Sequence, residues 1–440
     1  MSAPAPTATT ARVPFAGDPH DLVEPFAELF GPLFCYRLPG RERRTLLASL
    51  ADVWRITTDG IERGGERFDG DVAALLDHLL AEARRGPGAD VAFALSYDLS
   101  LRLRAEAGIP GGPWPTAAPG RLLGFAGPLR RAVVHDPATG TLSCAGEDRA
   151  NVMSACARTA ARAAPPPTAP LTEVVTDIDP HRYADQLARA REHLLAGDIY
   201  QVVLSVPVRV RPRTSLPRYY ADVAHRYATA DYSYWFSLDG ATVFGNCSLP
   251  HVLARDGRVR SRVFAGTQPA ARDERERQER GALLRADPKY FAEHIMLVDL
   301  ERNDLGSYCE PGTVVVDRLC EPLVIGPTTY LASDVSGAYD TARGLGGVVL
   351  ASFPRGVVVG APKLRAQEVL ADLEGEPRGF FAGAVGFYDA ARDALTSNTI
   401  VTCAERDGPD VLLRCGGGVV AGSDVTQELA ELDLKLRYLR

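Results

Sequence analysis

Short segments in which apolar and polar residues alternate fill much of the chain after residue 197, and this alternation is the strongest constraint on the fold. A strand that is buried on one face places every second side chain in the core, so the pattern is typical of antiparallel sheets. The segments with strand character are DIYQVVLSVPVRV (198–210), YSYWFSL (232–238), TVFGNCS (242–248), RVRSRVFAG (258–266), GTVVVDRLC (312–320), FFAGAVGFY (380–388) and DVLLRCGGGVV (410–420). They predict a large, mainly antiparallel sheet structure.

Segments with helical periodicity lie between these strands. In HRYADQLARAREHLLAG (181–197), apolar residues recur every three or four positions and a glycine suits the helix end. Further helices are predicted over 273–285, 288–301, 363–373 and 424–438. Earlier in the chain the signals are mixed, with LFCYRL (33–38) and VAFALSYDL (91–99) strand-like and VAALLDHLLAEARR (72–85) helix-like.

A proline-rich segment, ARAAPPPTAPLTEVV at 161–175, separates two halves of the chain. We predict an N-terminal half over 21–165 and a C-terminal half over 175–440. The opening MSAPAPTATTARVP is rich in Ala, Pro and Thr. It predicts a disordered tail over 1–20.

Composition excludes several classes of partner. The net charge is −7, and no basic patch is interleaved with aromatic residues, which argues against nucleic acid. No apolar run is long enough to span a membrane, and the first residues lack the features of a secretory signal. The eight cysteines contain no CxxC pair, so reduced thiols in the cytoplasm are the expectation. A small molecule or another protein is the expected partner.

Lysine is rare and falls in informative places. Of 49 basic residues only Lys289, Lys363 and Lys435 are lysines, which suggests sites where a compact ammonium is needed. Glu428, Glu431 and Lys435 are spaced i, i+3 and i+7, so a helix would display them on one face. Such a face suits either a solvated surface or Mg²⁺, which prefers oxygen ligands.

Seven blocks give the sequence a family resemblance. In order along the chain they are GDIYQVVLS (197–205), VFAGTQP (263–269), ADPKYFAEHIMLVDLERNDLG (286–306), YLASDVSG (330–337), FPRGVVVGAPKLRAQEVL (353–370), RGFFAGAVGFY (378–388) and GGGVVAGSDVTQELAELDLK (416–435). Together they resemble the chorismate-utilising enzymes, and in pattern they are most similar to the large subunit of anthranilate synthase. The resemblance covers roughly residues 180 to 440.

The resemblance implies an α+β fold of two stacked antiparallel sheets flanked by outer helices, with Mg²⁺ in the cleft between them. Its metal-binding glutamates match Glu293, Glu428 and Glu431, although Tyr290 replaces a further glutamate of the pattern. The substrate-binding residues of the family correspond here to Gly266, Thr267, Gly416, Gly417, Gly418 and Lys435.

The catalytic positions depart from the family in several places. Gln201 stands where isochorismate synthases carry a lysine that acts as base on water, which favours ammonia as the nucleophile. His251 replaces a glutamate that resembles the acid for the departing hydroxyl, and imidazolium could take over that role. Tyr330 replaces a histidine associated with loss of the enolpyruvyl group. Lys363 is a candidate for proton handling or electrostatic stabilisation, with a buried ion pair as the alternative.

The substrate pocket is predicted to be more apolar than in the family. Val401 replaces an arginine, Val357 a threonine and Phe387 a tyrosine. Valine can neither pair with a carboxylate nor donate a hydrogen bond from its side chain. The changes suggest an altered substrate or reaction.

The leading hypothesis is an anthranilate synthase-like lyase or aminase of specialised metabolism that adds ammonia at C2 of chorismate or a close analogue. The product would be 2-amino-2-deoxyisochorismate or anthranilate. The ammonia would come from a separate glutamine amidotransferase subunit or from solution, and a homo-oligomer is left open. The alternatives are an isochorismate or salicylate synthase-like enzyme, an enzyme acting on another acid, and a catalytically inactive binding relative.

Overall fold

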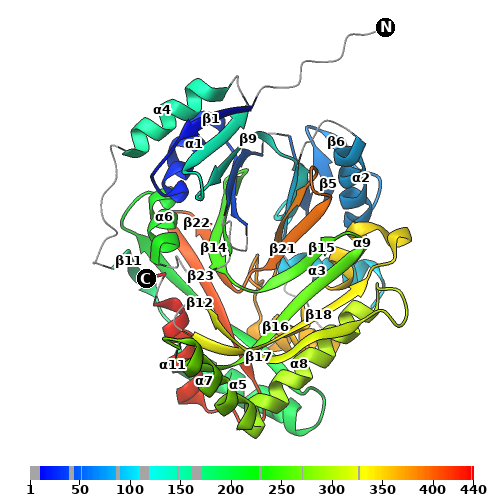
Figure 1. Cartoon of the computed structure of the whole chain (residues 1–440). Coiled ribbons are helices and arrows are strands. Elements are labelled where there is room, and N and C mark those ends of the chain that lie inside the picture. The colour runs from blue at the N-terminus through cyan, green and yellow to red at the C-terminus, as the bar shows by residue number, and fades with distance from the viewer. Residues whose placement is uncertain are drawn as a thin grey trace.

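The computed structural model describes residues 10–38, 44–50, 52–85, 90–109, 118–145, 148–160, 170–226, 230, 232–269, 271–325, 328–437 and 439–440. In this part of the chain two antiparallel sheets lie face to face with helices outside them (Figure 1). The predicted α+β fold with two stacked sheets is thereby confirmed.

The first sheet has twelve strands among the described residues. In spatial order they are β1 (Thr10–Pro14), β10 (Thr141–Ala145), β9 (Arg130–Asp136), β3 (Thr45–Ser49), β2 (Leu33–Arg37), β13 (Tyr232–Leu238), β14 (Ala241–Cys247), β22 (Thr402–Asp407), β23 (Asp410–Val419), β12 (Gln201–Pro212) and β11 (Thr172–Thr176), with β19 (Gly360–Ala361) paired to β12.

The second sheet has eleven strands in the same described part. Their order is β17 (Val315–Ile325), β18 (Thr328–Ala338), β16 (Arg258–Pro269), β15 (Pro250–Arg255), β21 (Ala394–Thr399), β20 (Ala384–Asp389), β7 (Val91–Leu95), β8 (Leu122–Pro128), β4 (Trp54–Thr57), β5 (Gly60–Arg63) and β6 (Glu66–Arg67).

The helices cover the outer faces and the lower end of the molecule in Figure 1. They are α1 (Val23–Phe30), α2 (Val72–Arg85), α3 (Tyr97–Glu106), α4 (Arg149–Ala160), α5 (Pro180–Leu195), α6 (Leu216–Arg226), α7 (Glu274–Ala286), α8 (Pro288–Gly306), α9 (Gly344–Ala351), α10 (Lys363–Glu374) and α11 (Val425–Leu436), with short 3-10 turns at η1 (Pro19–Leu22), η3 (Thr341–Arg343) and η4 (Gly356–Val358). None of the described helices is both long and apolar enough to cross a membrane.

The two halves predicted from the proline-rich segment are interleaved in space. Each sheet contains strands from before and after residue 165, so both halves share one fold. The predicted tail is ordered from residue 10, because Thr10–Pro14 pairs with β10 and buries Val13. That part of the prediction is wrong, and residues 1–9 lie outside the described residues.

The segment predicted as one strand over 91–99 changes structure at Ser96. The strand ends at Leu95 and α3 begins at Tyr97. The Ser96 hydroxyl accepts a hydrogen bond from the backbone N–H of Leu99, which satisfies a donor at the start of the helix. A helix cap therefore ends the strand.

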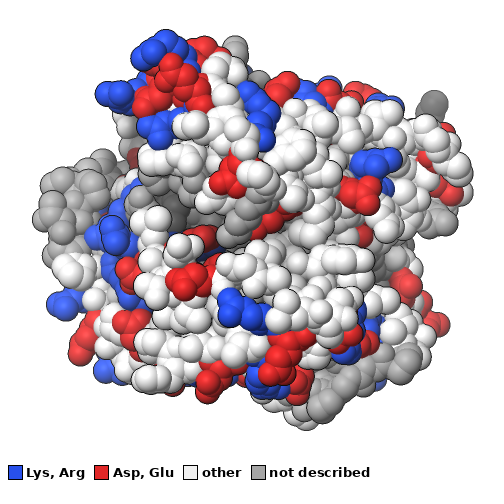
Figure 2. Space-filling model, turned by 90° about the horizontal axis from the view of Figure 1, so that it is seen from below, with Lys and Arg blue, Asp and Glu red and all other residues white. Residues whose placement is uncertain are grey.

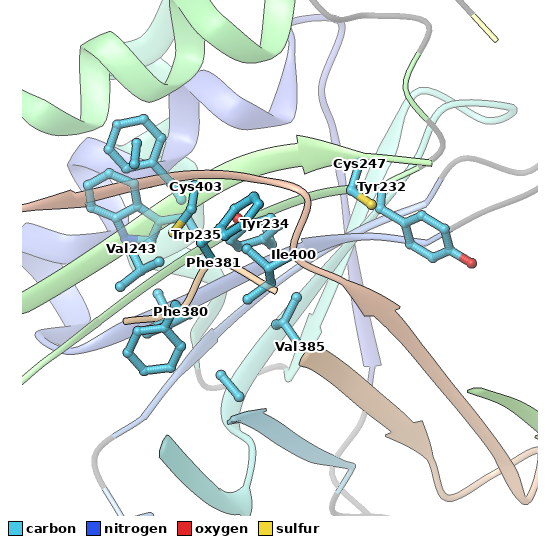
Figure 3. Close-up of a cluster of buried hydrophobic side chains, with 14 of the residues drawn as sticks. Tyr232, Tyr234, Trp235, Val243, Cys247, Phe380, Phe381, Val385, Ile400 and Cys403 are labelled. Carbon is cyan, nitrogen blue, oxygen red and sulfur yellow. The ribbon is translucent and has the colours of Figure 1, made fainter. Parts of the chain in front are cut away.

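The core between the sheets is aromatic (Figure 3). Phe125 of the second sheet contacts the rings of Phe34 and Phe236 of the first, with ring centroids 6.3 and 5.2 Å apart. Phe236 also meets Phe380, at 5.0 Å. Edge-on packing of this kind adds to the free energy gained from apolar burial. All eight cysteines are free thiols.

Candidate functional site at helix α11

The glycine run lies in a strand, although a triple glycine more often indicates a turn or bulge. Gly416, Gly417 and Gly418 belong to β23 and pair with Ser205, Leu204 and Val203 of β12. A Cβ added at Gly416 would lie 2.8 Å from the carbonyl oxygen of Leu204. Because the three glycines have no side chains, neighbouring groups can approach the backbone of this strand closely.

Two polar side chains use the space that the missing Cβ atoms leave. A Cβ at Gly418 would lie 2.3 Å from Nε2 of Gln201, and one at Gly417 would lie 3.3 Å from Oε2 of Glu428. Gln201 begins β12 and is buried. Its amide and the Glu428 carboxylate therefore lie against the glycine strand.

Lys435 links α11 to the same strand. Its Nζ donates a hydrogen bond to the carbonyl oxygen of Gly416 at 2.7 Å and forms an ion pair with Oε1 of Glu431, also at 2.7 Å. Burial alone would lower the pKa of Lys435, but the nearby Glu431 carboxylate raises it above its ordinary value. The ammonium is therefore charged at neutral pH. We call Glu428, Glu431 and Lys435, together with Gly416–Gly418, the α11 site.

Strands of the second sheet reach this site through aromatic residues. Tyr330 of β18 packs on Phe264 of β16, with ring centroids 5.1 Å apart, and its phenol acts electrostatically on Lys435. Gly266 has a φ of +72°, which favours glycine, and a Cβ there would meet Tyr290 of α8 at 3.5 Å. The side chain of Thr267 lies outside the described residues.

Tyr183 of α5 is a neighbour that the sequence did not identify. Its hydroxyl is buried, and no hydrogen-bond partner for it occurs among the described residues. Burial raises the pKa of its phenol, and the carboxylates of Glu428 and Glu431 raise it further. In the sequence Tyr183 occupies an ordinary core position of an amphipathic helix, so no signal marks it.

Helices α5, α7, α8 and α11 lie together at the lower end of Figure 1. Seen from that end, the surface is hollowed near its middle and acidic side chains lie along the hollow (Figure 2). Glu293 is half-buried on α8, which packs on β16 and β18. The three predicted carboxylates thus come from two helices, α8 over β16 and β18 of the second sheet and α11 over β23 of the first.

The metal prediction passes only part of a structural test. Carboxylate oxygens are the ligands that Mg²⁺ prefers. However, within the described ranges no three His, Cys, Asp or Glu side chains gather closely enough to hold a metal. Glu431 is instead paired with Lys435. The carboxylate oxygens therefore suit Mg²⁺ chemically, but the described residues do not bring three such side chains together.

The apolar replacements lie in different places. Val401 directly precedes Thr402, which pairs with Cys415, so it lies beside the glycine strand. Phe387 is buried on β20, where it pairs with Thr396, and it lines a groove described below. Only Val401 joins the α11 site by strand register.

His251 is buried between two serine hydroxyls, a setting that argues against the predicted role as an imidazolium proton donor. Its Nε2 and Nδ1 lie 2.8 and 3.2 Å from the hydroxyls of Ser352 and Ser397. Burial, aided by the charges of Arg355 and Lys363, lowers its pKa to about 3. This lowering of the pKa disfavours the imidazolium form at neutral pH.

Lys363 takes the structural alternative, a largely buried ion pair. Its Nζ lies 2.8 Å from Oδ1 of Asp304 on α8. Arg355 and Glu301 form a second pair at 2.5 Å, and the guanidinium also donates to the carbonyl oxygen of Pro250. We call Glu301, Asp304, Arg355 and Lys363 the buried charge network. It fastens the C-terminal half of α8 to the segment that leads into α10.

Comparison with known proteins decides the family. Residues 36–440 match the family described as chorismate binding enzyme. The chain belongs to this family. Among the curated chorismate binding enzymes, anthranilate synthase component 1 of Streptomyces coelicolor is 41% identical over 281 residues, 62% of this chain and 52% of that protein. The 2-amino-4-deoxychorismate synthase of Streptomyces globisporus is 32% identical over 267 residues, 61% of this chain and 54% of that protein.

The match spans about half the length of these curated relatives. Among solved structures, anthranilate synthase component I of Streptococcus pneumoniae superposes with a TM-score of 0.74 at 22% identity, over 91% of this chain and 93% of that one. An isochorismate synthase of Bacillus anthracis gives 0.66 at 21%, over 93% and 95%. At such identities the likeness establishes the fold.

Proposed function

We propose that this chorismate binding enzyme adds ammonia at ring C2 of chorismate or a close analogue, giving 2-amino-2-deoxyisochorismate or anthranilate. The observation that carries the proposal is the position of Gln201. Its amide lies against Gly418, in the same short glycine run whose Gly417 adjoins the Glu428 carboxylate and whose Gly416 carbonyl accepts a hydrogen bond from Lys435. A carboxamide cannot take a proton from water at neutral pH, so a nucleophile that attacks without a strong base is favoured.

The residues of the α11 site have separable roles in this proposal. Lys435 supplies a fixed positive charge beside the glycine strand, which favours an anionic substrate. The open strand surface at Gly416–Gly418 lets a planar ring approach the backbone. Val401 and Tyr330 give the pocket an apolar flank. Tyr330, a phenol, is a poor base at neutral pH, so the proposal includes slow loss of pyruvate.

Mg²⁺ is part of the proposal, with Glu293, Glu428 and Glu431 as its protein ligands. When bound, it would supply positive charge for a ring carboxylate. To bind Mg²⁺, the Glu431 carboxylate would have to give up its ion pair with Lys435. Calorimetric titration of the protein with MgCl₂ tests this without turnover. A Glu431→Gln variant should bind at least about tenfold more weakly, and equal affinity would remove Glu431 from the ligand set.

The reaction is tested by incubating the protein with chorismate, MgCl₂ and ammonium chloride, followed by mass analysis. The expected product carries nitrogen and forms only with ammonium. Isochorismate formed without ammonium would favour the synthase neighbours' reaction, and absence of both turnover and chorismate binding would reject the proposal. A partner amidotransferase is expected to replace ammonium with glutamine.

The variants Glu431→Gln and Asp433→Asn give a matched pair on α11. Asp433 is exposed and, two residues on, lies on another face, where it pairs with Arg437 and Arg440. Turnover should fall about 10- to 100-fold in Glu431→Gln and stay within about twofold in Asp433→Asn. Equal losses of turnover in the two variants would show that turnover depends on α11 as a whole and not on the face that carries Glu431.

A further inference from the structure

A groove of about 580 Å³ lies on the second sheet, away from the α11 site. Part of its wall comes from Arg258 and Arg260 at the beginning of β16, whereas Gly266 lies near the end of that strand. Eight residues separate Arg258 from Gly266, roughly 26 Å along a strand. The groove is therefore distinct from the site of the proposed function.

The floor of the groove is a row of cross-strand neighbours. Leu253 pairs with Arg260 on one side and with Thr396 on the other, and Thr396 pairs with Phe387. Residues paired in this way present their side chains on the same face of a sheet. The row therefore places an apolar surface from Leu253 and Phe387 next to the guanidinium of Arg260.

The charge in the groove is unbalanced. The five arginines that line it are Arg44, Arg255, Arg258, Arg260 and Arg392, against the two acids Asp256 and Asp389. Both acids are already engaged, Asp256 with Arg255 at 3.3 Å and Asp389 with Arg392 at 2.6 Å. The groove is thus positive in a chain whose net charge is −7.

Arg258 and Arg260 are two of the arginines that neither acid engages. Arg258 donates a hydrogen bond to the hydroxyl of Ser336 at 2.9 Å. Across the residues that the structure describes, no carboxylate lies within ion-pair distance of either guanidinium. Two residues apart on one strand, the two side chains leave the same face roughly 7 Å from each other. That spacing lets both reach a single anionic group between them.

We propose that this groove binds a small molecule in which an anionic group, a carboxylate or a phosphate, is attached to a ring. Arg258 and Arg260 hold the anion, because guanidinium groups bind such oxygens in a bidentate manner. Leu253 and Phe387 contact the ring. The volume is that of an ordinary ligand pocket, with apolar side chains in its floor and polar groups that fix orientation. The proposal is independent of the reaction at the α11 site.

The test is calorimetric titration of the full chain at low ionic strength with phenyl phosphate, benzoate, inorganic phosphate and phenol as probes. Phenyl phosphate or benzoate should bind with one-to-one stoichiometry, and the tighter of the two identifies the anion. That probe should bind at least about tenfold more tightly than inorganic phosphate or phenol. Equal binding of inorganic phosphate would show a general counter-ion effect and reject the proposal.

Variants locate the binding. Arg260→Gln and Arg258→Gln should each weaken the favoured probe about tenfold or more, because each removes one charged hydrogen-bonding group. Both arginines are exposed, so the variants are expected to fold. Arg275→Gln is the matched control, since Arg275 is exposed on α7 and pairs with Glu279. Glu431→Gln should bind the probe normally. Unchanged affinity in both groove variants, or loss in Glu431→Gln, would overturn the proposal.

Discussion

Lys435 of the α11 site and Lys363 of the buried charge network meet their carboxylates at nearly the same distance, 2.7 and 2.8 Å, in very different surroundings. The side chains of Lys435 and Glu431 are 38% and 48% exposed, whereas those of Lys363 and Asp304 are 18% and 10% exposed. An exposed pair contributes little to stability and can exchange partners. A buried pair cannot be separated without leaving a charge in the core.

The same family pattern thus marks two kinds of residue. In the α11 site, the charges of Lys435 and Glu431 lie beside the glycine strand and are partly exposed to solvent. In the buried charge network, Arg355 and Glu301 are almost fully enclosed and form an ion pair with one another. Five experiments test this difference, beginning with the network, where the largest change in the free energy of unfolding is expected.

Replacement of Arg355 by methionine should lower the free energy of unfolding by about 3–5 kcal/mol, because Glu301 is left buried without its partner. Urea denaturation followed by circular dichroism measures the change. The control is Arg302→Met on α8, next to Glu301, because the exposed pair of Arg302 with Asp299 predicts a change below about 1 kcal/mol. If the two variants behave alike, the network is not the buried clamp described above.

The double variant Glu301→Leu/Arg355→Met refines this result. Removing both charges should recover part of the loss, since no unpaired ion then remains. The loss of stability in the double variant could instead equal the sum of the losses in Glu301→Leu and Arg355→Met. That result would mean that Arg355 acts mainly through its hydrogen bond to Pro250.

His251 predicts a pH dependence that belongs to the network region. Its pKa of about 3 in the folded chain lies below the ordinary value of 6.5. Between these two pH values the unfolded chain binds a proton that the folded chain does not, so stability is present above pH 6.5 and falls as the pH is lowered toward 3. The slope from this residue is at most about 1.4 kcal/mol per pH unit.

Thermal unfolding at pH 6.5, 5.5 and 4.5 should therefore show a shallower loss for His251→Gln than for the natural chain. His294→Gln is the comparison, because burial lowers the pKa of His294 to about 4 and predicts a similar effect over this pH range. Parallel pH profiles for His251→Gln and the natural chain would mean that His251 is not buried in its neutral form.

Local sequence patterns were sufficient where structure depends on near neighbours. The helix predicted over 72–85 forms as α2 with the same bounds, and YSYWFSL forms β13. The i, i+3 and i+7 spacing of Glu428, Glu431 and Lys435 placed them correctly on one helix, because helical geometry alone sets that spacing.

Contacts between distant segments could not be predicted in the same way. The position of Gln201 over Gly418 depends on pairing between β12 and β23, which lie some two hundred residues apart. Tyr183 reads as an ordinary core residue until α5 packs near α11, and the partner of Lys363 lies on another helix. Alternation predicts that a strand forms, but it does not identify the strand's neighbour.

Gly418→Ala separates geometry from stability in the α11 site. The new Cβ would lie 2.3 Å from the Gln201 amide, which must move. Because that amide is the end of a flexible side chain, the free energy of unfolding should change by less than about 1 kcal/mol, while ammonia-dependent turnover falls about 10- to 100-fold. Gly422→Ala is the control, since nothing lies within 4 Å of its Cβ. Normal turnover in Gly418→Ala would remove Gln201 from the reacting centre.

The smallest effect on stability is expected for Tyr183→Phe. Its hydroxyl is buried with no hydrogen-bond partner among the described residues, so its removal should leave stability unchanged or raise it by up to about 1 kcal/mol. Phenylalanine keeps the ring that packs in the core. Urea denaturation measures the change, with Tyr219→Phe as the control, because the Tyr219 hydroxyl donates to the carbonyl oxygen of Leu439 and its loss should be destabilising. A loss of stability in Tyr183→Phe as large as that in Tyr219→Phe would show that the Tyr183 hydroxyl has a hydrogen-bond partner beside Glu428 and Glu431. The α11 site would then resemble the buried charge network more closely than the exposed pair of Lys435 and Glu431 indicates.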